Sequence, residues 1–432
     1  MGASGIGIGS VPISMLLLFF LTAVLGLRPA LAGVVVALPK IWDVLVDPGI
    51  GGWVDRIARR TGTRTPILLA SAAAYVVSVY LLFSLPVFGS DWATMSACVL
   101  LLIVSSVSHT ALGVSHLAVV NDMTVDAKER TSLLAFSGVT TAILTLAATA
   151  SVPILIAWGG AGQAGYARMA GMIALFSGVA FLAFIATTRR YKVRIGTNPG
   201  GDLSLFSSIR ATFSNHAFYF LIGFLVVFGI TAGVIGAFVP FINQYILHGG
   251  PAGLSVLGSI VLVCTIGAMP LAALIARRFG NLLTLHLGNL IVISSFPLMY
   301  AASFGPIWAT WLVVGLFGLG AGGLAIILQS MIIDIAKTVL PGGIVVSLGV
   351  YLGILVAGQK LGQSAGAMLA GLVLDAIGFV SGAASQSADT ISVLRVGYTL
   401  VPLGLSILGT VFLWRVKLRA GGQAGEAVPN GD

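Results

Sequence analysis

The stretch ALAGVVVALPKIWDVLVDPGIGGW, residues 30–53, is the part of this sequence that decides the fold. It is long enough to cross a bilayer as a helix, because a membrane-spanning helix needs about 20 mostly apolar residues. It nevertheless contains Lys40, Asp43 and Asp47. Charged groups are costly inside a bilayer, so this stretch predicts a membrane helix that carries a functional site.

The rest of the chain has the same apolar character. Of its 432 residues, 58% are hydrophobic and 8% are charged, against roughly 25% charged in soluble domains. Apolar runs this long, without strand-like alternation, exclude a β-barrel and predict an all-α integral membrane protein with about twelve transmembrane helices. The predicted spans are 5–26, 30–53, 66–86, 94–120, 131–157, 166–187, 217–246, 253–276, 282–302, 306–333, 344–374 and 393–414.

The basic residues predict how the chain is oriented. Most of the 22 Lys and Arg residues fall in the even-numbered connections between predicted helices or in the C-terminal tail. Positive charge is retained on the cytoplasmic side, so we expect both termini in the cytoplasm of a multi-pass protein of the bacterial inner membrane. The net charge of +9 is scattered over several loops without an aromatic platform, so no nucleic-acid partner is expected.

The longest polar connection divides the chain into two halves. It covers residues 188–215 and follows the sixth predicted helix. The expected organisation is an N-terminal six-helix bundle at 1–187, a cytoplasmic loop at 188–215, a C-terminal six-helix bundle at 216–416 and a cytoplasmic tail at 417–432. Transporters are often built from such repeats, with the substrate site between them.

The charges of the second predicted helix form one stripe. Asp43 and Asp47 are four residues apart and share a helix face, with Lys40 one turn earlier. Two carboxylates in a poorly solvated site repel each other, so either one holds a proton or a cation lies between them. In the alternative interpretation, Lys40 simply neutralises Asp43 while Asp47 is hydrated near the interface.

Lys360 is the corresponding charge in the second half of the chain. It lies in the middle of the eleventh predicted span, too far from either end to reach water easily. Asp43 and Asp47 are the acids available to it within the spans, which predicts a charge pair between the two halves. Such a pair would stabilise one conformation and open when a cation competes for the carboxylates.

Few other polar groups within the spans could line a substrate pocket. The histidines His109 and His116 lie two turns apart on the fourth span, where either could titrate or simply pack. We find no grouping of a nucleophile with a base and no zinc-ligand spacing, so neither an enzyme nor a cofactor is expected. The pocket candidates are His109, His116, Asn243, Gln244, Gln329 and Gln359.

The second span and the loop after it carry a recognisable motif. The motif is a basic residue, Trp-Asp, Asp-Pro-x-x-Gly and then Asp-Arg, which here are Lys40, Trp42, Asp43, Asp47, Pro48, Gly51, Asp55 and Arg56. Three further blocks agree, at residues 123–133, 251–280 and 358–379. On these blocks the chain resembles the glycoside-pentoside-hexuronide:cation symporter family of the major facilitator superfamily.

The resemblance implies a monomeric major facilitator fold of two six-helix bundles that transports a small-molecule substrate by alternating access across the lipid bilayer. In that family, two carboxylates and a hydroxyl bind the coupling ion, H⁺ or Na⁺, and the matching residues are Asp43, Asp47 and Thr110. Lys360 matches the family's helix-11 lysine, and Lys360 and Lys40 would balance charge in the empty state. The expected cytoplasmic gate consists of Asp55, Arg56, Arg59 and Arg60.

The sequence departs from the family pattern at positions that affect the cargo. Val46 replaces an asparagine of melibiose-type members, which removes an oxygen donor and favours H⁺ over Na⁺. Gly113 occupies the place of a sugar-binding acid, and the first span contains no acidic residue. A sugar or glycoside follows from the resemblance, whereas these gaps favour an amphipathic or lipid-like substrate. A membrane assembly factor that uses this fold without transport is the other alternative.

Overall fold

The computed structural model describes residues 2–124, 126–160, 162–191, 193, 205–336, 346, 348–383 and 385–416. The predicted C-terminal tail at 417–432 and most of the predicted central loop lie outside these residues. Within the described part, every regular element is a helix. The elements are α1 (Gly2–Phe19), the π-helical η1 (Phe20–Val24), α2 (Pro29–Thr61), α3 (Thr65–Phe83), α4 (Asp91–Met123), α5 (Ala127–Trp158), α6 (Gly162–Thr188), α7 (Leu205–Phe213), α8 (His216–Tyr245), α9 (Gly250–Phe279), α10 (Asn281–Ala302), α11 (Ile307–Ala336), α12 (Leu348–Ala376) and α13 (Ala388–Trp414).

The apolar composition of these helices agrees with the predicted spans. In the described chain, 11 helical segments are long and apolar enough to cross a membrane. Helix α12 is absent from that set, because Gln359, Lys360 and Gln363 interrupt its apolar run. It still has 29 residues, which at about 1.5 Å per residue is long enough to cross a bilayer. With α12, the twelve predicted spans correspond to α1–α6 and α8–α13.

Several helices begin where the local sequence favours a helix start. Pro is at the first or second position of α2, α3 and α9, where its missing N–H costs nothing. Asn215 caps α8, since its side chain accepts hydrogen bonds from the N–H groups of Ala217 and Phe218. Helix α2 ends at Thr61 and is followed by Gly62, whose φ of 70° is the left-handed conformation that favours glycine.

Helix α2 continues further than the apolar pattern predicted. The span was expected to end at residue 53, but the helix continues to Thr61 and includes Arg56, Arg59 and Arg60. A helix does not have to end where the bilayer ends, because its hydrogen bonds are internal. These arginines are therefore on the last turns of a helix rather than in a loop. We call the end of the molecule where they lie the basic end.

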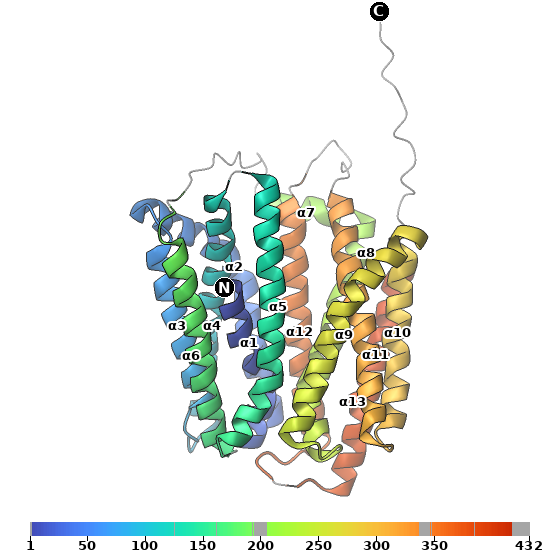
Figure 1. Cartoon of the computed structure of the whole chain (residues 1–432). Helices are drawn as coiled ribbons and strands as arrows, with labels where there is room; N and C mark the ends of the chain where they lie inside the picture. Colours follow the sequence, from blue (N-terminus) through green and yellow to red (C-terminus); the bar gives the residue numbers. More distant parts are fainter. Residues whose placement is uncertain are drawn as a thin grey trace, which may run out of the picture.

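The helices form two bundles, one made by α1–α6 and the other by α8–α13 (Figure 1). Helices α2 and α12 make an extensive contact between the bundles, and α5 packs on α9 in a second contact. Helix α7 lies across the basic end, at the top of Figure 1, before α8 begins. The predicted boundaries at residues 187, 215 and 416 remain predictions.

At the end opposite the basic end, the two bundles are in direct backbone contact. A Cβ added at Gly33 of α2 would lie 3.0 Å from the carbonyl oxygen of Met368, and one at Gly371 of α12 would lie 2.5 Å from that of Pro29. The Ser381 hydroxyl donates to the carbonyl of Leu27 at 2.8 Å. This end, which we call the closed end, contains no gap between α2 and α12.

Helices α2 and α12 separate toward the basic end. Gly51 lies one turn beyond Asp47 on the same face of α2, and Gly353 lies two turns before Lys360 on the same face of α12. A Cβ added at either glycine meets no heavy atom of the described chain within 4 Å. The two helices therefore touch at the closed end and diverge at the basic end.

Candidate functional site

Two helices of the first bundle present matching polar pairs to each other. Asp43 and Asp47 are four residues apart on α2, and Ser106 and Thr110 are four residues apart on α4. The Thr110 hydroxyl donates to Oδ1 of Asp47 at 2.8 Å. The Ser106 hydroxyl donates to the Asp43 carboxylate. Each carboxylate thus accepts a hydrogen bond from a hydroxyl group of the neighbouring helix.

Lys360 brings a positive charge from the second bundle to these acids. Its Nζ lies 2.5 Å from Oδ2 of Asp47 and 3.5 Å from Oδ2 of Asp43. The side chain of Asp43 is 6% exposed, whereas those of Asp47 and Lys360 are about a quarter exposed, at 25% and 27%. The charge pair between the halves that the sequence suggested is present in this conformation.

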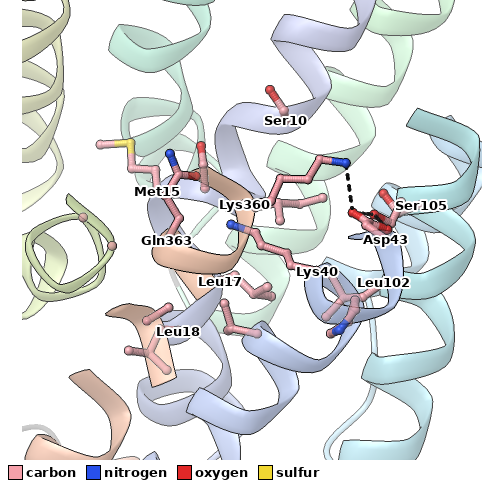
Figure 2. Close-up of a pocket in the computed structure, with 18 of the residues that line it drawn as sticks. Ser10, Met15, Leu17, Leu18, Lys40, Asp43, Leu102, Ser105, Lys360 and Gln363 are labelled. Carbon is pink, nitrogen blue, oxygen red and sulfur yellow. Dashed lines mark hydrogen bonds and ion pairs between the residues drawn. The ribbon is translucent and has the colours of Figure 1, made fainter. Parts of the chain in front are cut away.

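A cavity of about 470 Å³ lies beside this charge cluster. Its walls come from α1, α2, α3 and α4 of the first bundle and from α8 and α12 of the second. Figure 2 shows Asp43 and Lys360 on one side of it and Met15 and Gln363 on the other. The apolar lining includes Ile13, Leu17, Leu18, Val36, Pro39 and Leu102.

The part of the wall formed by α8 consists of small residues: Ala232, Gly233, Gly236 and Ala237. A Cβ added at Gly236 would meet no heavy atom of the described chain within 4 Å. The space in front of this glycine is therefore part of the cavity. Tyr75 and His109 also line the cavity, and their ring centroids lie 5.9 Å apart in an edge-on arrangement.

Lys40 also lines the cavity, but unlike Lys360 it forms no ion pair with the acids. Within the described residues it makes no hydrogen bond and has no carboxylate within ion-pairing distance. Figure 2 shows its amino group pointing away from Asp43 and into the cavity. Proximity along the helix therefore does not produce a Lys40–Asp43 pair here, because Asp43 is turned toward Ser106 and Lys360.

The predicted pocket residues fall into two groups. His109 lies on the cavity wall, together with Lys40, Asp43 and Lys360. The other candidates are not part of its lining. His116 hydrogen-bonds with Ser137 through Nε2 at 3.2 Å, and the Asn243 amide donates to the Gly250 carbonyl at 2.7 Å, closing the α8–α9 turn. Gln244 and Gln329 are exposed, and Gly113 and Gln359 are half-buried.

Several lining residues were missed by sequence reasoning. They are Ser10, Ser14, Tyr75, Ser105, Ser106 and Gln363. For Ser106 a signal was available, because it precedes Thr110 by one turn just as Asp43 precedes Asp47. Serine, threonine and tyrosine are common in membrane helices as packing residues, so composition does not distinguish the others.

Arg64, a buried arginine that sequence reasoning also missed, is paired with Asp55 of the predicted gate at the basic end. The Arg64 side chain is 10% exposed and makes 2.9 Å ion pairs with Asp55 of α2 and Asp122 of α4. It therefore ties the end of α2 to the end of α4. The predicted gate arginines Arg56, Arg59 and Arg60 are exposed on the same end and face a shallow surface hollow.

Comparison with known proteins gives a consistent family. A family model described as "MFS/sugar transport protein" matches residues 1–420. The isoprimeverose transporter of Lactiplantibacillus pentosus is 25% identical over 415 residues, which cover 93% of this chain and 84% of that protein. The glucuronide carrier protein homolog of Escherichia coli strain K12 is 24% identical over 420 residues, covering 93% and 87%.

Solved structures agree on the fold. A crystal structure of a bacterial homolog of the human lysosomal transporter Spinster, in an inward-facing and unoccupied conformation, superposes with a TM-score of 0.72. It covers 97% of both chains at 13% identity. At this identity the likeness concerns the arrangement of the helices alone, which is the major facilitator arrangement.

Proposed function

Because the chain belongs to the MFS/sugar transport family of secondary transporters, we propose that it couples the movement of a small organic solute to that of H⁺ or Na⁺. The observation that carries the proposal is the contact of Lys360, from the second bundle, with Asp47 and Asp43 of the first. Binding of a cation at a coupling site must change the contact between the two bundles, and this cluster contains residues of both.

In this proposal, Lys360 occupies the place of the coupling cation in the empty protein. Removing one partner of a poorly solvated ion pair leaves an uncompensated charge, which costs about 3–5 kcal/mol. The bundles therefore separate at this point only when another cation compensates Asp43 and Asp47. A bound H⁺ or Na⁺ releases Lys360, and the equilibrium between the two conformations shifts.

The oxygen atoms around the acids support a cation site of this kind. Hard cations bind oxygen ligands, and Asp43, Asp47, Ser106 and Thr110 present carboxylate and hydroxyl oxygens to one another. The Ser106 hydroxyl supplies an oxygen to this group, whereas Val46 supplies none. Both ions are therefore retained in the proposal, and the choice between them belongs to the experiment.

We place the basic end in the cytoplasm, with both termini on that side of a bacterial inner membrane, and we expect the transporter to act as a monomer. The support is the collection of Arg56, Arg59, Arg60 and Arg64 at that end. With this orientation the divergence of α2 and α12 faces the cytoplasm.

The test is uptake into liposomes that contain the purified protein, driven by an imposed Na⁺ or pH gradient. The solutes are isoprimeverose and a glucuronide, the types of solute named for its relatives. Asp47→Asn and Asp43→Asn should each abolish uphill accumulation, whereas Asp389→Asn, on the exposed first turn of α13, should not change it. Accumulation by the Asp47→Asn variant at the native rate would contradict the proposal.

A further inference from the structure

Four formally charged groups lie at or beside the cavity, which Lys40, Asp43 and Lys360 line, and three of the four are engaged with one another. Asp43, Asp47 and Lys360 form one cluster with Ser106 and Thr110. Lys40 is on the same wall, but its amino group is directed into the open volume. An ammonium in a poorly solvated cavity is unfavourable when it makes no direct hydrogen bond or ion pair, and within the described chain Lys40 makes neither.

The surroundings of Lys40 indicate the chemistry of the missing partner. The amide of Gln363 borders the same cavity and makes no hydrogen bond in the described chain. The remaining wall is largely apolar, with Ile13, Leu17 and Leu102 on it. On the α8 wall, a Cβ added at Gly236 would meet no heavy atom of the described chain within 4 Å, so there is free space in front of this residue. A ligand that fits would have one negatively charged group and an apolar body.

We infer that the transported solute is an organic monoanion whose charged group binds Lys40 and whose apolar body fills the space in front of α8. This inference rests on the proposed function, because it assigns the cargo of the same cavity. It favours neither a neutral sugar nor a zwitterion. The free donors at Lys40 and Gln363 match an anionic acceptor, and among the described residues that line the cavity the one carboxylate, that of Asp43, is already engaged.

The charges of the cluster explain how the anion and the coupling cation depend on each other. With Lys360 on the acids, the formal charges of Lys40, Lys360, Asp43 and Asp47 cancel. A bound H⁺ or Na⁺ adds one positive charge, and a monoanion at Lys40 removes it again. Each ligand therefore favours the other electrostatically, and linkage requires that the cation raises the affinity for the anion by the same factor as the anion raises the affinity for the cation.

The experiment compares two solute pairs that differ mainly in charge. The first is 4-nitrophenyl β-D-glucuronide with 4-nitrophenyl β-D-glucoside, and the second is 4-phenylbutyrate with 4-phenylbutanol. Binding to the purified protein is measured by calorimetry and by the shift in melting temperature, since a ligand that binds the folded state stabilises it. At least one anion should bind roughly tenfold or more tightly than its neutral partner, the size expected for a charge-assisted hydrogen bond.

Variants of Lys40 test whether this residue produces the preference. Lys40→Gln should abolish it, and Lys40→Arg should retain it, because arginine keeps the charge. Lys128→Gln removes one positive charge from an exposed position outside the cavity and should change nothing. The melting temperature of each variant without ligand shows whether it is folded, so loss of binding by a folded Lys40→Gln protein is informative.

The outcomes separate this inference from the proposed function. Binding of neither anion, equal binding within both pairs, or an unchanged preference in Lys40→Gln would overturn the anionic cargo. If a neutral solute is instead accumulated in an Asp47-dependent manner, cation coupling stands and the anion inference falls. If the anion binds through Lys40 but no gradient drives its uptake, the anion site stands and the coupling proposal falls.

Discussion

At the scale of single residues, the two hydroxyls of α4 are the most direct test of the cation site. Thr110→Val removes the donor at 2.8 Å from Asp47, and a hydrogen bond to a charged group contributes about 1.5–3 kcal/mol. With Na⁺ as the coupling cation, which loses an oxygen ligand, we expect the concentration at half-maximal uptake to rise roughly 10- to 100-fold. With H⁺ it should fall, because the ionised carboxylate loses a stabilising donor. Ser106→Ala should have an effect of the same direction, and Thr149→Val, whose hydroxyl donates only to its own helix backbone, serves as the control. An unchanged cation dependence in both variants would remove α4 from the site.

Arg64 provides a prediction about stability. Arg64→Gln leaves Asp55 and Asp122 without the guanidinium that now lies 2.9 Å from each of them. Because Arg64 and Asp122 are largely buried, we expect a loss of about 3–5 kcal/mol. The melting temperature in detergent should fall clearly, while Arg60→Gln on the exposed surface should leave it within experimental error. Equal melting temperatures for the two variants would show that the buried pair is not stabilising.

These residues also show where sequence reasoning succeeds and fails. The acids of α2 and Lys360 could be predicted because charge inside an apolar run is rare and each such charge needs a partner. Arg64 could not be separated from Arg56, Arg59 and Arg60 by type or position, since its burial depends on where Asp122 of α4 ends up. The unpaired state of Lys40 is likewise a property of side-chain direction, which the sequence does not contain.

At the scale of helices, the contact of α2 with α12 is the element that closes one end. The backbones approach at Gly33 and Gly371, where any side chain would collide with a carbonyl. Gly371→Val should therefore disfavour this conformation and expose the closed end. The readout is maleimide labelling of a cysteine at Ser381, in a protein whose Cys98 and Cys264 are replaced by serine. Gly51→Val, which meets no described atom within 4 Å, is the control and should not raise labelling.

The helices themselves were predicted well because length and apolarity decide a span. The exceptions have physical causes. Helix α2 continues to Thr61 since helical hydrogen bonding does not depend on the bilayer, and α7 (Leu205–Phe213) is too short to give a clear apolar run. The candidates Asn243 and His116 were polar for structural reasons: one closes a turn and the other pairs with Ser137.

At the scale of the whole molecule, alternating access predicts opposite changes at the two ends. In the conformation described here, a cysteine at Gly353 should label readily and one at Ser381 slowly, because α2 and α12 diverge at the former and meet near the latter. Solute and coupling cation together should lower the first rate and raise the second as the population shifts. Parallel changes at both ends would argue against an exchange of open ends.

The pair between Asp47 and Lys360 also has a consequence for how the protein is made. Its two residues are separated by 313 positions, and α12 is the long helix whose polar cluster keeps it below the apolarity of the other spans. During synthesis, α2 enters the membrane long before its positive partner exists. We expect α12 to be retained in the bilayer only after it finds α2, so the second half expressed alone should insert α12 poorly and co-expression of the first half should restore it.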